Sequence, residues 1–323
     1  MRIFESSTPN AERLRSLLKY AVLAPSSHNT QPWRFQINNN TVSLYADRTR
    51  ALPANDPDDR ELTISCGCAL MNLRVAAAHE GLDMTCEIVP DHNDEDLLAV
   101  ASFHETESPS LGETELFQSI EARRTYRKRF APREVTDSIL LALIEAATEE
   151  GAWLQVIESE SIRQSIAAIV SEGDLLQWSN PSWRRELAAW IHPRHRGDGL
   201  TVPGIVAPIA HIVVRTFDLG KGVGAKDKQL VDESSVIAVL GTEGDSVIDW
   251  LGAGQALERI LLKAQANGLQ ASFLNQPIQV ASLRPKLQSL LGRTGFAQIL
   301  LRLGFPADQL DSVPRRSLDE IVD

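Results

Sequence analysis

The sequence predicts an α+β protein with three-layer α/β/α character, built from two similar halves that form one inseparable unit. Three observations support this fold class. Apolar runs typical of strands alternate with helical patterns, two long segments are apolar on nearly every side, as buried helices are, and these two segments resemble each other. We therefore expect an internal repeat whose long helices pack together in the middle.

The repeat is clearest in the two apolar segments 66–82 and 253–269. At a constant offset the same amino acids recur, and both segments end in Gly-Leu, which is typical of a helix C-terminal cap followed by an apolar contact. The matching positions are Gly67 and Gly254, Ala69 and Ala256, Leu70 and Leu257, Ala77 and Ala264, Gly81 and Gly268, and Leu82 and Leu269.

A second match lies between WRFQI at 33–37 and WLQVI at 153–157, each of which follows a helix and opens a strand. Its offset is smaller than that of the long helices, so the second half must carry an insertion between Trp153 and Gly254. The segment 173–204, rich in Trp, Gly and Pro, is the expected insertion, and its composition suits a lid or a domain-capping arm. We place the first half at 1–112 and the second at 113–323.

The individual elements follow from local patterns. A hairpin turn is expected at 38–40, where asparagine tolerates positive φ, a helix at 135–147, and a surface turn in the glycine-rich segment 220–228. Asp245 is the expected N-cap of a helix over 246–266. Strands are expected at 42–46, 97–103, 153–158, 209–216 and 297–303.

Composition excludes several classes of protein. The chain has 323 residues and 43% apolar content, enough for a large core, and its net charge of −11 disfavours nucleic acid as a partner. It has no run of about 18 apolar residues and no signal-peptide pattern, so we expect a cytoplasmic protein without a membrane segment. The sparse cysteines, and a proline between His192 and His195, disfavour a metal site.

Two segments carry chemistry, and each half has only one of them. The first half has the loop APSSHNTQPWRF at 24–35, and the second has the basic segment RRTYRKRF at 123–130. Arginines can bind a phosphate in bidentate fashion, and the hydroxyls and amides of the loop can satisfy the polar edge of a flat heterocycle. Together they predict one composite site for a mononucleotide-like cofactor such as FMN.

Each signal has a plainer interpretation when taken alone. The loop at 24–35 would be a helix-to-strand connection with side-chain turns, and the segment 123–130 would be a solvated charged face. Arg315 and Arg316 would be surface residues. His28 is expected to be a structural hydrogen-bonding residue in preference to a proton donor.

This combination of segments resembles the flavin-dependent nitroreductase family. The segments 123–127 and 25–33, the long apolar helices and Pro314-Arg315-Arg316 are similar to its basic stretch, its Pro-Ser-x-x-Asn-x-Gln-Pro-Trp loop, its central helix and its C-terminal basic pair. LYADRTRALPANDPDDRELTISCG and LNQP are similar to segments of the Acg-type branch, in which two nitroreductase-like halves are fused.

The resemblance implies a nitroreductase-like fold, an intramolecular pseudo-dimer that allows a monomer, and one FMN per chain. It also implies roles for residues. The phosphate would be held by the basic residues, the ring would be lined by the polar loop, and flavin N5 would lie beside the backbone after the second long helix. These residues are Arg123, Arg124, Thr125, Arg127, Arg315 and Arg316 for the phosphate; Pro25, Ser26, Ser27, Asn29 and Gln31 for the ring; and Leu274 and Asn275 for N5.

The activity implied is that of an FMN-dependent oxidoreductase, with NADH or NADPH as the electron donor and a nitroaromatic, a quinone or another small molecule as the acceptor. No catalytic side chain is required, because flavin N5 carries the chemistry. The alternative is an FMN-sequestering or storage protein whose lid closes the flavin face. A third possibility is a scaffold that binds no flavin.

Overall fold

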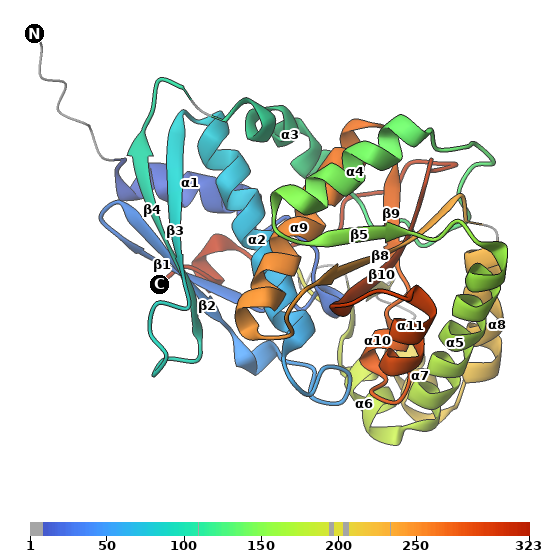
Figure 1. Ribbon diagram of the computed structural model, residues 1–323. Coiled ribbons are helices and arrows are strands. Elements are labelled where there is room, and N and C mark those ends of the chain that lie inside the picture. Colours follow the sequence, from blue (N-terminus) through green and yellow to red (C-terminus); the bar gives the residue numbers. More distant parts are fainter. Residues whose placement is uncertain (1–8, 109, 194–196, 203–206, 233) are drawn as a thin grey trace, which may run out of the picture.

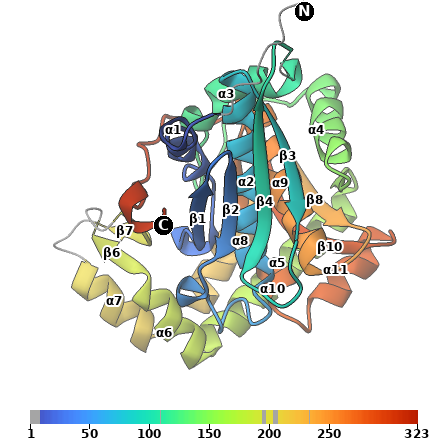
Figure 2. The ribbon, with the colours of Figure 1, turned by 90° about the vertical axis from the view of Figure 1, so that its left-hand side faces the viewer.

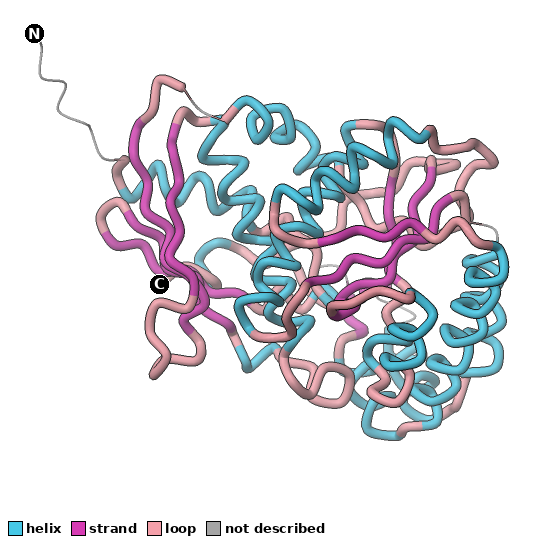
Figure 3. Tube along the Cα trace, in the orientation of Figure 1, coloured by secondary structure: helices cyan, strands magenta, loops and turns pink. Residues whose placement is uncertain are grey.

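Two four-stranded sheets with the same strand order flank a central layer of helices (Figures 1 and 3). The computed structural model describes residues 9–108, 110–193, 197–202, 207–232 and 234–323. Parts of the expected lid, at 194–196 and 203–204, lie outside these ranges, as does His195. In the described ranges, none of the helices has the length and apolarity needed to cross a membrane.

The strand order is identical in the two halves. In each sheet, counted along the chain, the order is first, second, fourth, third, with antiparallel neighbours. The first sheet contains β1 (Trp33–Asn38), β2 (Thr41–Ala46), β4 (Leu97–Glu105) and β3 (Leu82–Ile88), and the second contains β5 (Trp153–Val156), β8 (Val236–Thr242), β10 (Phe296–Gly304) and β9 (Gln270–Phe273). The repeat expected from the sequence is thus present in the topology.

The two long helices α2 (Arg60–His79) and α9 (Val247–Ala266) lie side by side between the sheets, and Figure 2 shows both behind the first sheet. They touch at the equivalent glycines. A Cβ added to Gly67 would lie 2.9 Å from the Gly254 Cα and 2.2 Å from the Leu251 carbonyl oxygen, and one added to Gly254 would lie 2.8 Å from the Gly67 Cα. Equivalent positions of a repeat meet in this way at a pseudo-twofold axis.

The Gly-Leu ends of the repeat also behave as expected. Gly81 and Gly268 follow the last residues of α2 and α9 with φ of 73° and 78°, the left-handed conformation that glycine adopts most easily. The next residues, Leu82 and Leu269, are buried in the main core.

The second sheet lies between two helical layers, which is the three-layer arrangement expected. Ala238, Leu240 and Leu301 pack into the main core with α2 and α9, while Ile237 and Val239 point to the opposite face. That face is covered by α5 (Glu160–Ser179) and α11 (Arg284–Leu291). The remaining helices are α1 (Ala11–Ala21), α3 (Leu111–Ala122), α4 (Asp137–Glu149) and α10 (Gln276–Gln279).

The halves differ most between their first two strands. In the first half a tight turn containing Asn39, at φ 52°, joins β1 to β2. In the second half the connection from β5 to β8 contains α5, α6 (Pro181–Ala189), β6 (Ile191–Pro193), β7 (Leu200–Val202), α7 (Ala207–Thr216) and α8 (Gly220–Asp232). The extra segment therefore lies in the expected interval and extends beyond 173–204 on both sides. The boundary between the halves at 112/113 stays a prediction.

Three local predictions were wrong. The segment 209–216 belongs to helix α7, because packing against α6 outweighed the β-branched character of Ile212, Val213 and Val214. The segment 220–228 belongs to helix α8, whose Gly224 lets the helix approach Ser171 of α5.

The third concerns the start of α9. Its N-cap is Ser246, which forms a capping box with Asp249. Asp245 instead forms an ion pair with Arg284 at 2.7 Å.

The C-terminal segment of the second half returns to the first sheet. The Phe35 amide donates to the Ile321 carbonyl at 2.7 Å, and the Asp323 amide donates to the Phe35 carbonyl at 2.9 Å. Short 3-10 helices complete the fold at η1 (Ser27–Asn29), η2 (Arg48–Arg50) and η4 (Leu318–Glu320). The two halves are therefore joined by the tail as well as by the central helices.

Candidate functional site

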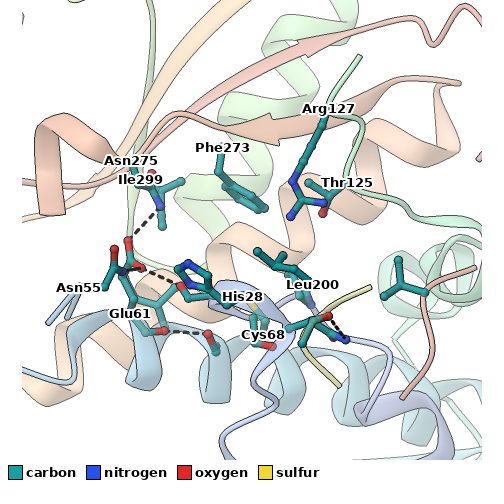
Figure 4. A pocket seen from close by; sticks show the side chains of 18 of the residues that line it. His28, Asn55, Glu61, Cys68, Thr125, Arg127, Leu200, Phe273, Asn275 and Ile299 are labelled. Atoms are coloured by element: carbon teal, nitrogen blue, oxygen red, sulfur yellow. Dashed lines mark hydrogen bonds between the residues drawn. The ribbon is translucent and has the colours of Figure 1, made fainter. Parts of the chain in front are cut away.

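A cavity of about 760 Å³ opens between the halves and the inserted segment (Figure 4). Its walls come from the η1 loop and α2 of the first half, from the residues after α3, from α9 and the β9–α10 connection, and from the C-terminal segment. Pro25, Ser26, Ser27, Asn29, Arg123, Arg124, Thr125, Arg127, Asn275 and Arg315 line it. The structure thus brings most of the predicted residues of both halves to one place.

One end of the cavity is cationic. Arg123, which follows the last residue of α3, and Arg315, from the C-terminal segment, both donate through Nη2 to the carbonyl of Leu23, at 3.1 and 2.9 Å. Burial lowers the pKa of Arg315 to about 9, with the neighbouring charge of Arg123 acting in the same direction, so the Arg315 guanidinium is still cationic at neutral pH. Two fixed positive charges therefore stand in the cavity wall.

The basic segment is held in place by β9. Thr125 forms an isolated parallel bridge with Ala271, and the Tyr126 amide donates to the Ala271 carbonyl at 2.8 Å. This pairing presents Thr125 and Arg127 to the cavity (Figure 4). Within the described residues Arg127 has no hydrogen-bond or ion-pair partner, whereas the next residue, Lys128, pairs with Asp308 away from the cavity.

The polar loop has an unusual backbone. His28, Asn29 and Gln31 all have positive φ, between 52° and 55°, a conformation that non-glycine residues adopt rarely. The loop is stabilised by hydrogen bonds from the Gln31 amide to Ser26 Oγ at 2.9 Å and from Ser27 Oγ to Glu61 Oε2 at 2.7 Å. Strained backbone held by such contacts is common at functional sites.

Glu61, in the first turn of α2, organises the other end of the cavity and was not predicted. Its buried carboxylate accepts hydrogen bonds from Ser27 and, at 3.3, 3.2 and 2.9 Å, from the side-chain amides of Asn55, Asn275 and Gln279 (Figure 4). Ser27 belongs to the η1 loop, Asn55 precedes α2, and Asn275 and Gln279 stand at the two ends of α10. A glutamate near the start of a helix carries no local signal for this role, because Asn275 and Gln279 lie far away in the sequence.

Three predicted site residues do not line the cavity. Gln31 is fully buried behind the loop, where its Nε2 donates to the Gly197 carbonyl at 2.9 Å and its Oε1 accepts from the Arg316 amide at 2.9 Å. Arg316 thus holds the loop in place through its backbone amide, and its side chain forms an ion pair with Asp47. Leu274 packs into the core beneath the second sheet.

The inserted segment supplies one wall of the cavity. Trp178, Trp183, Leu187 and Leu200 line it, and the Trp183 indole donates to Asn55 Oδ1 at 2.9 Å. Trp178 and Trp183 pack edge to face with ring centroids 5.5 Å apart. The third tryptophan of the segment, Trp190, lies under the Arg50 guanidinium, 5.1 Å from its ring centroid.

His28 faces the cavity from the strained loop (Figure 4). Burial, assisted by the charge of Arg127, lowers its pKa to about 4, so the imidazole is neutral at neutral pH. Its Nδ1 is buried without a hydrogen-bond partner in the described part of the chain. A neutral ring with an unused nitrogen fits contact with a bound ligand better than proton donation as an imidazolium.

No family model matches the chain, but comparison with known proteins finds relatives that are named as NAD(P)H nitroreductases. Mycobacterium tuberculosis Rv3131, whose name places it among the NAD(P)H nitroreductases, is 32% identical over 98% of this chain and 92% of its own. Acg of the same organism, named likewise, is 28% identical over 95% and 94%. A solved structure, the Vibrio harveyi NADPH:FMN oxidoreductase complexed with NAD+, has a TM-score of 0.42 and 14% identity over 65% of this chain and 76% of its own.

The Acg-like resemblance seen in the sequence is thus confirmed by relatives whose matches cover nearly all of this chain. The chain belongs to the NAD(P)H nitroreductase family.

Proposed function

We propose that the protein binds one FMN in the cavity between its halves and acts as an NAD(P)H-dependent oxidoreductase. The observation that carries this proposal is the composite cavity, whose cationic end and polar end are brought together from segments far apart in the sequence. Its volume of about 760 Å³ lies within the range of cofactor pockets. The names of the relatives support the donor class.

The cationic end fits a phosphate. Arg123 and Arg315 are fixed by the Leu23 carbonyl, and Arg127 adds a guanidinium that the described chain leaves without a partner. Charge-assisted bonds from arginine to phosphate are among the strongest hydrogen bonds in proteins. These residues would bind the phosphate and set the position of the rest of the cofactor.

The polar end fits a ring with donors and acceptors on its edge. Ser26, Ser27, Asn29 and Asn275 line the cavity here, and His28 offers an unused nitrogen. A bound FMN would supply the redox chemistry, by hydride transfer from a nicotinamide through flavin N5 to a nitroaromatic, a quinone or another small acceptor. The residues of the loop would orient the ring and exclude water from one of its edges.

Flavin content tests the proposal. Purified protein should be yellow and release about one FMN per chain, and the apoprotein should bind added FMN in preference to FAD. Two flavins per chain, or protein that is colourless and binds no added flavin, would contradict the composite site. Anaerobic mixing of the holoprotein with NADH or NADPH should then bleach the visible flavin absorbance.

A second candidate function is FMN sequestration. It is favoured by the wall made of Trp178, Trp183 and Leu200, since these side chains come from the inserted segment and line the cavity that the FMN would occupy. In that case the protein would bind FMN tightly, and its absorbance would stay unchanged with either nicotinamide. The anaerobic mixing experiment separates the two functions.

A further inference from the structure

A buried carboxylate lies behind the cationic end of the cavity. Glu258, in the middle of α9, is fully buried, and the Arg123 Nε lies 3.4 Å from its Oε1. In the described part of the chain neither of its oxygens accepts a hydrogen bond of normal geometry. The amide of Asn72, close by on α2, directs its Nδ2 donor at the Tyr20 carbonyl, 3.3 Å away. A buried carboxylate that accepts no hydrogen bond is costly in its charged form, and the guanidinium of Arg123 offsets that cost only in part.

The groups that face Glu258 come from each element packed around it. From α2 come the amide of Asn72 and the thiol of Cys68, which burial keeps neutral by raising its pKa. Arg123 approaches from the end of α3, and Arg315 from the C-terminal segment. The carboxylate thus shares with the cavity the same two guanidinium groups that face the proposed phosphate.

This geometry sets up a competition between two anions. Arg123 and Arg315 line the cavity, whereas Glu258, which the Arg123 Nε approaches to 3.4 Å, is not among the lining residues. Both arginines donate to the Leu23 carbonyl, which holds their guanidinium groups in place. The same two groups therefore face both the Glu258 carboxylate and the phosphate. A phosphate dianion in the cavity therefore adds repulsion to Glu258 through a poorly solvated region, and protonation of the carboxylate relieves that repulsion.

We infer that Glu258 is a positioning residue of the anion site and that it takes up a proton from solvent when the phosphate of the cofactor binds to Arg123 and Arg315. The reaction at Glu258 is carboxylate plus one proton giving the neutral acid, with no other bond made or broken. This inference rests on the proposed FMN binding, and it adds a dependence of that binding on pH.

The direction of the dependence follows from linkage. Burial raises the pKa of free Glu258 to about 7, against the opposing effects of Arg123, Asn72 and Arg315, and the bound phosphate raises it further. Below about pH 7 the carboxyl is already protonated, and no uptake accompanies binding. As the pH rises above 7, FMN affinity falls, by at most about tenfold per pH unit for one proton.

The experiment measures protons directly. Apoprotein of the full chain is titrated calorimetrically at pH 8 in two buffers of different ionisation enthalpy, with FMN and with riboflavin, which lacks the phosphate. The second pKa of the phosphate, about 6, is too low to contribute at this pH. We expect the wild type to take up a substantial fraction of a proton with FMN and none with riboflavin.

Two variants complete the test. Glu258→Gln should abolish the uptake and flatten the dependence of the FMN dissociation constant on pH between 7 and 8.5. Glu150→Gln is the control, since Glu150 is a buried carboxylate that pairs with Arg74 and Arg259 outside the cavity lining. The proton uptake of this variant on FMN binding should equal that of the wild type.

FMN binding without proton uptake by the wild type would overturn the inference and leave the proposed function intact, as would equal uptake by wild type and Glu258→Gln. Absence of FMN binding would overturn the proposed function itself. If Glu258→Gln fails to fold, the comparison of FMN with riboflavin on the wild type still decides.

Discussion

Removal of the Arg127 side chain should weaken FMN binding without harming the fold. Arg123 and Arg315 also hold the Leu23 carbonyl, so their loss would disturb the loop, whereas Arg127 has no partner among the described residues and projects into the cavity (Figure 4). Arg127→Ala therefore separates cofactor binding from stability more cleanly than the other arginines do.

The magnitude follows from one charge-assisted contact, which is worth about 1.5–3 kcal/mol. Arg123 and Arg315 remain beside the cavity in this variant, so we expect the lower part of that range, about 10- to 30-fold in the dissociation constant. Fluorescence titration of apoprotein with FMN measures it. The adjacent Lys128→Ala, which removes a surface ion pair with Asp308, is the matched control and should leave the constant unchanged.

A second readout comes from His28. The charge of Arg127 adds to burial in lowering the pKa of His28 to about 4, so Arg127→Ala should raise that pKa, as NMR titration of the imidazole would show. Equal FMN affinities for the wild type and Arg127→Ala, together with an unchanged His28 pKa, would refute the placement of this guanidinium between phosphate and loop.

Three further predictions concern the architecture. Gly67→Ala should destabilise the protein by about 1–3 kcal/mol, because its Cβ would overlap the backbone of α9, whereas Gly222→Ala, which meets open space, should not; chemical denaturation compares them. Leu200→Ala should widen access to the cavity and speed flavin reduction by NAD(P)H in stopped flow, whereas Leu219→Ala, at an exposed position, should not. Equal rates for the wild type and Leu200→Ala would show that β7 does not control access to the site. Sedimentation should show a monomer, since α2 and α9 already pack within one chain; a dimer joined through these helices would contradict this.

The repeat and the composite site could be predicted because their signals are local. Gly67 and Gly254 stand in apolar helical segments that match each other, and the sequence places them at equivalent positions before any contact is known. The left-handed glycines after α2 and α9 are likewise a local property. The polar loop and the basic segment could be assigned to one composite site because each of them occurs in only one of the two halves.

Other parts of the site depend on contacts between distant segments, which no single pattern contains. Glu61 gains its importance from Asn275 and Gln279, which lie more than half the chain away. Gln31 has the chemistry of a ring-lining residue, yet it turns away to meet the backbone of Arg316. Helix α7 was mistaken for a strand because its β-branched residues signal a strand locally, and only packing against α6 shows otherwise.

The return of the C-terminal segment to the first half has a consequence for biogenesis. The loop at 24–35 is synthesised early, yet its closing contacts, from Gln31 to Arg316 and from Leu23 to Arg315, require residues that leave the ribosome almost three hundred positions later. Domains often begin to fold during synthesis, but this site cannot close until Arg315 and Arg316 have emerged from the ribosome. Binding of the proposed FMN would therefore require almost all of this sequence to have been synthesised.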